Sequence, residues 1–221
     1  MIKACIFDMD GTVADTLTTI AYFANAALDH FGLPTIDKEK YKLMVGDGAS
    51  VLVRRMMDEV GAPDELYDRV RTYYNSTYDS NFLYLTEPYD GILPMLRELK
   101  RAGIRTAIVS NKPESTACKI SEKLFGDLIE RCRGGRAGVP LKPNPQAVLE
   151  TLAELGVGPD ECLYIGDTAV DMETGKRAGI YSIGVLWGFR DEKELCEAHA
   201  DMIVSSPTEI ISIALGGEER E

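Results

Sequence analysis

Two aspartates near the N-terminus, Asp8 and Asp10, are the residues whose type and spacing most directly suggest chemistry. They follow an apolar run at residues 4–7 that is typical of a buried strand, and Gly11 and Thr12 come directly after them. Because alternate residues of a strand point to the same side, the two carboxylates can act together. One can bind a metal ion and attack a substrate while the other transfers a proton. The same residues also suit a turn before a helix, so this segment alone leaves both interpretations open.

Polar residues follow three further strand-like segments. Ser110 and Asn111 come after one apolar run, Lys142 stands before a Pro-Asn-Pro sequence, and Asp167 and Asp171 come after another apolar run. A parallel sheet brings the carboxyl ends of its strands to one edge, where ligands bind in open α/β folds. We therefore expect these residues to converge with the first two aspartates.

The combined chemistry is that of a phosphoryl site with a divalent metal. Carboxylate oxygens without sulfur or imidazole ligands suit Mg²⁺. A hydroxyl, an ammonium and free backbone amides suit phosphoryl oxygens. Each residue taken singly has an ordinary structural role, such as a turn, a helix cap or a solvated lysine. Their placement at successive strand ends favours the functional interpretation.

The elements that must position these residues alternate between strand and helix after residue 87. The strands are expected at residues 4–7, 105–109, 162–165 and 181–185, with a further short one at 128–131. Helices are expected at residues 92–103, after Pro113, and from Asn144-Pro145 to residue 155. Two more are expected, one between the strand at 162–165 and residue 178 and one that begins at the capping box of Ser206. This alternation predicts an α/β fold, a three-layer, doubly wound and mainly parallel sheet. The polar tail at residues 216–221 is expected to be frayed.

One block interrupts the alternation. Residues 16–86 contain helical patterns at 20–31, 51–61 and 66–78 and no convincing strand. We therefore expect a discontinuous core at residues 1–15 and 87–221, with an inserted all-helical domain at residues 16–86. An insertion directly after the first strand would lie over the carboxyl edge of the sheet.

Composition restricts the class of protein. The 221 residues are 45% hydrophobic and 27% charged, and the net charge is −12. Such a charge repels phosphate backbones, so a nucleic-acid partner is not expected, and an anionic substrate would need a metal or well-placed cations. Five scattered cysteines and two histidines favour neither a disulfide framework nor a His-rich metal site. Neither a secretion signal nor a membrane segment is expected, which predicts a cytoplasmic protein without a membrane partner.

The four signatures resemble those of the haloacid dehalogenase superfamily of phosphatases. The matching segments are Asp8-x-Asp10-Gly11-Thr12, Ser110-Asn111, Lys142-Pro-Asn-Pro and Gly166-Asp167-x-x-x-Asp171. The order and the spacing both agree, and the resemblance covers nearly the whole chain. The helical insertion is similar to the small helical cap of that family. Val45-Gly46-Asp47-Gly48 and the segment at residues 184–188 resemble its phosphoglycolate phosphatase branch.

The resemblance implies a role for each matched residue. Asp8 would attack phosphorus and form an aspartyl-phosphate, and Asp10 would act as general acid and then as general base. Ser110 and Lys142 would hold phosphoryl oxygens. Mg²⁺ would bind Asp8, the backbone carbonyl of Asp10 and Asp167. Asp171 would ligate the ion, support its ligands or orient Lys142. Gly11, Thr12, Asn111 and, from the cap, Arg54 are the predicted substrate-binding residues.

The resulting prediction is a Mg²⁺-dependent phosphatase that acts on a small phosphorylated metabolite, with phosphoglycolate as the leading substrate. A phosphohexose mutase or a pyrophosphatase on the same scaffold is an alternative. A non-enzymatic phosphate-binding regulatory protein is a further one, although no catalytic position is lost. Asp10 disfavours a phosphorelay receiver, since a long-lived acyl phosphate avoids an efficient base. The sequence leaves the oligomeric state and the cap residues that set specificity open.

Overall fold

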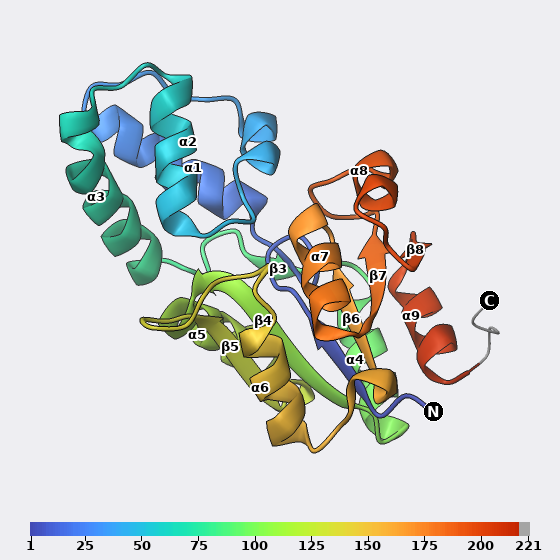
Figure 1. Cartoon of the computed structure of the whole chain (residues 1–221). Helices are drawn as coiled ribbons and strands as arrows, with labels where there is room; N and C mark the ends of the chain where they lie inside the picture. The colour runs from blue at the N-terminus through green and yellow to red at the C-terminus, as the bar shows by residue number, and fades with distance from the viewer. Residues whose placement is uncertain (217–221) are drawn as a thin grey trace.

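A six-stranded parallel sheet forms the centre of the computed structural model, which describes residues 1–216 (Figure 1). The strand order is β5-β4-β1-β6-β7-β8. The strands are β1 (Ala4–Phe7), β4 (Arg105–Pro113), β5 (Arg131–Gly135), β6 (Cys162–Gly166), β7 (Tyr181–Val185) and β8 (Met202–Val204). Phe7 pairs with Ile108 on one side and with Ile165 on the other. The carboxyl ends of the three central strands therefore lie level with one another, as the sequence predicted.

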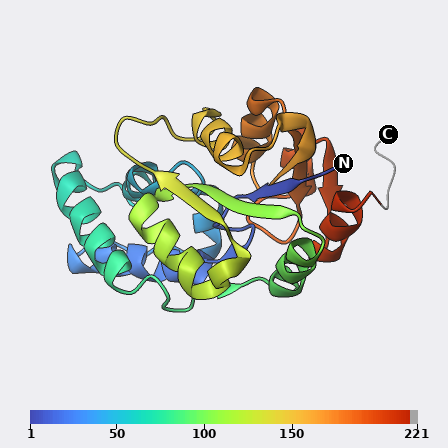
Figure 2. The same ribbon diagram turned by 90° about the horizontal axis from the view of Figure 1, so that it is seen from below.

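Helices cover both faces of this sheet (Figure 2). Cys5, Phe7 and Ile108 point into a hydrophobic cluster with one set of helices, whereas Ala4 and Ile6 point into a separate cluster with the other set. The first set is α4 (Ile92–Arg101), α5 (Glu114–Phe125) and α9 (Pro207–Ala214), and the second is α6 (Gln146–Leu155) and α7 (Ala169–Ala178). Alternate strand residues thus bury opposite faces, which gives the expected three-layer α/β fold.

Residues 16–86 form a helical block with its own hydrophobic cluster, at one end of the molecule (Figure 1). Its helices are α1 (Leu17–His30), α2 (Ala49–Glu59) and α3 (Tyr67–Ser80), with short 3₁₀ turns at Lys38–Leu43 and Asp64–Leu66. All of these residues are described, and they contain no strand. The chain enters the block after β2 (Ala14–Asp15) and leaves it at β3 (Glu87–Pro88), and these two short strands pair antiparallel.

The structure corrects several sequence-based boundaries. The strand predicted at residues 128–131 lies instead at Arg131–Gly135, after a 3₁₀ turn at Gly126–Leu128. This edge strand ends in two glycines because a Cβ at Gly134 would lie 2.4 Å from the Cα of Glu114, so it lacks an apolar signal. The strand expected to end at Val109 continues irregularly to Pro113. The pattern missed α8 (Glu192–Glu197), β8 and the β2–β3 pair, all of which are short.

The capping box at Ser206 opens α9, as expected. The five cysteines are free thiols in the structure. Most of the predicted frayed tail, residues 217–221, lies outside the described residues. None of the helices in residues 1–216 combines the length and the apolar composition that a membrane crossing requires.

Candidate active site

The loop after β1 brings the first aspartate pair to the edge of the sheet. The Asp8 amide donates to the carbonyl of Ile165 (2.8 Å), so Asp8 is fixed between β1 and β6. The backbone amides of residues 12–14 all donate to the carbonyl of Met9, which makes the loop a tight turn. Gly11 has φ +89°, and a Cβ there would lie 2.3 Å from Oδ2 of Asp167. A side chain at this position would therefore collide with the acidic group that follows β6.

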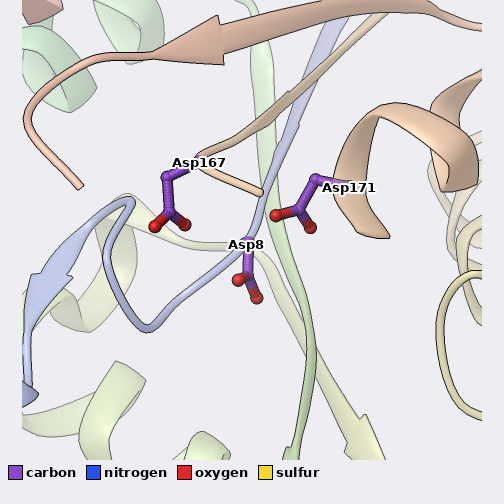
Figure 3. Close-up of side chains that lie close together, drawn as sticks. All are labelled: Asp8, Asp167 and Asp171. Carbon is purple, nitrogen blue, oxygen red and sulfur yellow. The ribbon is translucent and has the colours of Figure 1, made fainter. Parts of the chain in front are cut away.

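Three buried carboxylates meet at this edge (Figure 3). Asp8, Asp167 and Asp171 each offer an oxygen, and these oxygens all lie within 4.8 Å of one another. Asp167 is oriented by two donors, the Thr12 hydroxyl (3.0 Å, to Oδ1) and the Phe189 amide (2.8 Å, to Oδ2). Oδ2 of Asp171 accepts from the hydroxyl (2.7 Å) and the amide (3.2 Å) of Thr168, which closes a capping box at the start of α7.

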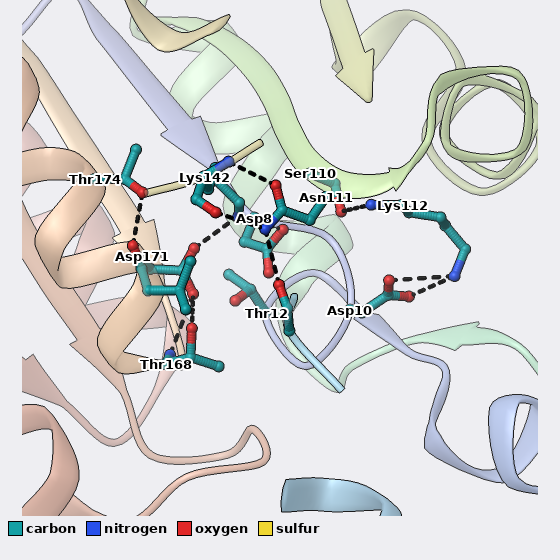
Figure 4. Close-up of polar contacts among 12 residues, drawn as sticks. Asp8, Asp10, Thr12, Ser110, Asn111, Lys112, Lys142, Thr168, Asp171 and Thr174 are labelled. Atoms are coloured by element: carbon teal, nitrogen blue, oxygen red, sulfur yellow. Dashed lines mark hydrogen bonds and ion pairs between the residues drawn. The ribbon is translucent and has the colours of Figure 1, made fainter. Parts of the chain in front are cut away.

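Lys142 lies among these carboxylates (Figure 4). Its Nζ is 2.8 Å from Oδ1 of Asp8 and 2.7 Å from Oδ1 of Asp171, and the residue is only 6% exposed. Burial disfavours the charged amine, but Asp171 and Asp8 outweigh it and hold the pKa of Lys142 well above its usual range. The side chain of Asn111 accepts from the Lys142 amide (2.8 Å) and donates to its carbonyl (3.0 Å), which fixes the position of the lysine.

The electrostatics of this cluster fit a divalent cation. Burial raises the pKa of Asp8 to about 6, against the opposing effect of Lys142, and burial also raises the pKa of Asp167. Three carboxylates face one ammonium, so the buried group carries excess negative charge when all are ionised. Oδ1 of Asp8 contacts that ammonium and takes part in no hydrogen bond within residues 1–216. Hard, clustered oxygen donors of this kind suit Mg²⁺.

Asp10 points to the other side of Asp8, away from the acidic cluster (Figure 4). Both of its carboxylate oxygens contact Nζ of Lys112, at 3.0 and 3.2 Å. This ion pair lines a cavity of about 50 Å³ between the sheet edge and the helical block. The core contributes Asp8, Asp10 and residues 110–113, and the block contributes residues from the 45–52 segment and from α3. The helical block therefore does lie over the carboxyl edge.

Of the remaining predicted site residues, some line this cavity and others do not. Ser110 and Asn111 line the cavity beside the first aspartate pair. Gly11 and Thr12 are not among the lining residues, and the Thr12 hydroxyl acts on Asp167 instead. Arg54 pairs with Asp64 on the outside of the block and is not brought to the cavity.

Sequence reasoning assigned no role to two features of this site. Lys112 directly follows Ser110 and Asn111 in the sequence. Nothing in the spacing indicated that its ammonium would contact Asp10. The second feature is the segment at residues 187–190; the resemblance noted at residues 184–188 includes its first two residues but not Phe189 or Arg190. In the structure, the Trp187 indole donates to the carbonyl of Thr12 (2.9 Å), and Phe189 packs into the hydrophobic cluster of the helical block. The guanidinium of Arg190 donates to the backbone carbonyl of Val45 in the block (3.0 Å).

Comparisons with known proteins agree with this architecture. The sequence profile of the family described as haloacid dehalogenase-like hydrolase matches residues 5–185. A phosphoglycolate phosphatase from Chromobacterium violaceum is 31% identical over 220 residues, which cover 98% of both chains. An N-acetylmuramic acid 6-phosphate phosphatase from Pseudomonas aeruginosa is 31% identical over 217 residues, covering 96% of this chain and 94% of the relative.

A solved structure shows the same agreement over the whole fold. A protein from Lactobacillus delbrueckii subsp. bulgaricus, provisionally assigned as a phosphoglycolate phosphatase, superposes with a TM-score of 0.89 and 30% identity. The match covers 97% of this chain and 98% of that protein. The similarity therefore includes the helical block as well as the sheet.

Proposed function

The chain belongs to the haloacid dehalogenase-like hydrolase family, and we propose that it hydrolyses a small phosphate monoester through an aspartyl-phosphate on Asp8. One observation carries this proposal: Asp8, Asp167 and Asp171 converge with Lys142 at the sheet edge, while Asp10 stands on the opposite side of Asp8. A nucleophile, a cation for phosphoryl oxygens and a separate acid–base group are thus within reach of one substrate phosphorus.

The proposed reaction has two steps. A carboxylate oxygen of Asp8 attacks phosphorus while the bond to the leaving oxygen breaks, and Asp10 gives that oxygen a proton. A water molecule then attacks the phosphorus of the acyl phosphate. Asp10 takes the proton of this water, and the P–O bond to Asp8 breaks to release inorganic phosphate. Lys142 and the Ser110 hydroxyl bind phosphoryl oxygens throughout, which lowers the repulsion between two anions.

We propose Mg²⁺ as the cofactor. Asp8 and Asp167 would hold it together with the backbone carbonyl of Asp10. When bound, Mg²⁺ supplies positive charge that stabilises the transferring phosphoryl group. Asp171 differs from Asp167 in its partners: Oδ1 of Asp171 contacts the ammonium of Lys142 and Oδ2 accepts from Thr168, whereas both donors to Asp167 are neutral. We therefore assign Asp171 to the orientation of Lys142 rather than to direct ligation.

The leading substrate is phosphoglycolate. Both curated relatives described above are named for phosphate esters of acids, phosphoglycolate and N-acetylmuramic acid 6-phosphate. The cavity between the sheet edge and the helical block is small, at about 50 Å³, which favours a small leaving group.

We further propose that residues 16–86 act as a cap that closes over the site. Three contacts between the block and the core support this assignment. The Asn111 amide donates to the carbonyl of Gly46 (2.9 Å), Arg190 donates to Val45, and the Thr116 hydroxyl donates to Asp79 on α3. A closed cap excludes bulk water, which would otherwise compete with the substrate for these polar groups.

The test is a steady-state assay of 2-phosphoglycolate and p-nitrophenyl phosphate with purified protein. We expect Mg²⁺-dependent phosphate release that EDTA abolishes, and no release by Asp8→Asn with an unchanged far-UV circular dichroism spectrum. A ³²P-labelled ester should leave label on wild-type protein after an acid quench, and none on Asp8→Asn. Folded protein that releases no phosphate from a broad panel of esters in the presence of Mg²⁺ would refute the proposal and favour a regulatory phosphate-binding role.

A further inference from the structure

We propose that Lys112 and Tyr78 form a subsite for a carboxylate on the leaving group, so that this enzyme prefers phosphate esters of small hydroxy acids over neutral or cationic esters of the same size. The inference rests on the proposed phosphatase function and deepens it by assigning specificity to two residues. Lys112 comes from the core at the end of β4, and Tyr78 comes from α3 of the helical block.

Lys112 is a buried cation in the reaction cavity. The residue is only 8% exposed, and its Nζ contacts both oxygens of Asp10 and lies 4.6 Å from the centre of the Tyr78 ring. The two contacts to the Asp10 carboxylate and the face of the Tyr78 ring both suit an ammonium. A buried lysine is costly unless its charge has partners, so its position inside a ligand cavity calls for a reason.

The charges around the cavity show what Lys112 can attract. Asp8, Asp10 and Asp79 also line it, and Lys112 is the only lysine or arginine that lines it in the described part of the chain. Lys142 lies on the far side of Asp8, between that carboxylate and Asp171. In a chain with a net charge of −12, an anion on the leaving group would meet repulsion except at Lys112.

Tyr78, which contacts the Lys112 ammonium, supplies a second feature. Its hydroxyl is buried beside the Lys112 ammonium, which interacts with the phenol oxygen, and its O–H has no acceptor within residues 1–216. Burial raises the pKa of Tyr78, partly offset by the Lys112 ammonium, so the phenol stays neutral and can donate. A buried donor without a partner is uncommon in folded proteins. A hydroxyl donor next to an ammonium matches a ligand with anionic acceptor oxygens.

The reaction geometry fixes where that anion must be. Asp10 serves the leaving oxygen, and Lys112 contacts the same carboxylate, so the group that Lys112 binds must lie within a few bonds of the leaving oxygen. The small cavity suits a carboxylate on the adjacent carbon. A bound carboxylate would share the Lys112 ammonium with Asp10 and would therefore weaken the ion pair between Lys112 and Asp10. Glycolate, the leaving group of phosphoglycolate, has this form.

The experiment uses three esters of equal length with different leaving-group charge: 2-phosphoglycolate, 2-hydroxyethyl phosphate and 2-aminoethyl phosphate. We expect wild-type kcat/KM to fall in that order, with phosphoglycolate at least about tenfold above the hydroxyethyl ester, the range that a charged hydrogen bond gives. In Lys112→Met, the three values should fall within about threefold of one another. Lys119→Met, at an exposed position on α5, should keep the wild-type order.

The readout is the ratio of kcat/KM between two esters. Lys112 also contacts Asp10, so loss of Lys112 should lower the turnover of all three esters, and a ratio is unaffected by this common decrease. Tyr78→Phe leaves Asp10 untouched and should reduce the phosphoglycolate preference mainly through KM. Binding provides a measure without turnover: on an Asp8→Asn background, Lys112→Met should weaken phosphoglycolate more than hydroxyethyl phosphate in calorimetry.

Two results would overturn the subsite. One is a wild-type enzyme that turns over the three esters equally, and the other is a Lys112→Met enzyme that keeps the wild-type preference. If Lys112→Met does not fold, an unchanged preference in folded Tyr78→Phe has the same consequence. Absence of hydrolysis with every ester would instead contradict the phosphatase proposal itself, so the two failures are distinguishable.

Discussion

Replacing Lys142 by methionine should destabilise the metal-free protein far more than an ordinary lysine substitution does. The ammonium is buried between two carboxylates, at 2.8 Å from Asp8 and 2.7 Å from Asp171. Methionine fills nearly the same volume but removes the charge. The variant would therefore leave three buried carboxylates within 4.8 Å of one another without a nearby cation.

The size of the effect follows from these distances. Each contact at about 2.7 Å corresponds to about 6 kcal/mol of attraction at an effective dielectric constant of about 20. The cost of burying the charges cancels much of this attraction, and removal of one partner from a buried ion pair typically costs about 3–5 kcal/mol. For a chain of this size, each 1 kcal/mol lowers the melting temperature by about 2–4 °C. We expect a decrease of about 6–20 °C in EDTA.

Mg²⁺ should restore more stability to the Lys142→Met variant than to the wild type, because the ion would supply the missing positive charge. The assay is urea unfolding with and without Mg²⁺, followed by far-UV circular dichroism and by the fluorescence of Trp187, the single tryptophan. The control is Lys100→Met, which removes an exposed pair with Asp127 and should change stability little. Equal unfolding free energies for the two variants in EDTA would refute the buried-charge argument.

Three other predictions concern catalysis, the cap and pH. Asp10→Asn should lower turnover by about 10²-fold or more with unchanged circular dichroism, and near-normal turnover would reassign the general acid–base role. Arg190→Ala should raise KM and speed proteolysis near Val45, because it loses the contacts to the cap backbone, whereas the exposed Arg177→Ala should do neither. Burial opposes ionisation of Glu209, but hydrogen bonds from two serines outweigh it and lower its pKa below 4.5. Its stabilising effect is therefore present above about pH 4.5 and is lost on acidification, so Glu209→Gln should lower the free energy of unfolding at pH 7 and progressively less below pH 4.5 in urea titrations. A pH-independent difference would contradict this reasoning.

The sequence predicted the fold where an element has a strong periodic or apolar signal. The strands at the centre of the sheet are continuous apolar runs because both of their faces are buried, and β1 was recognisable for this reason. Edge elements carry no such signal. β5 consists of Arg-Cys-Arg-Gly-Gly, and its position depends on a close approach to the turn before α5 that no local pattern encodes.

The site was predictable to the extent that the topology alone determines it. Because parallel strands end at one edge, Asp8 and Asp167 had to lie close together once both were assigned to strand ends. Side-chain direction is a different matter. Thr12 turns to Asp167 instead of to the substrate cavity, and Lys112 reaches across to Asp10 from a strand that continues beyond its predicted end. Such contacts depend on the packing of distant segments, which spacing along the chain does not determine.

The positions of two buried lysines explain how an acidic chain can bind an anionic substrate at all. The net charge of −12 repels such a substrate at long range, so affinity must come from local charges in a low-dielectric site. Lys142 faces Asp8 and Asp171, on the proposed phosphoryl side, and Lys112 faces Asp10, on the proposed leaving-group side. Each lysine is held by the same carboxylates that the proposed chemistry uses. In the proposed reaction, an ester with a phosphoryl group and a carboxylate would therefore meet one of these lysines on each side of Asp8.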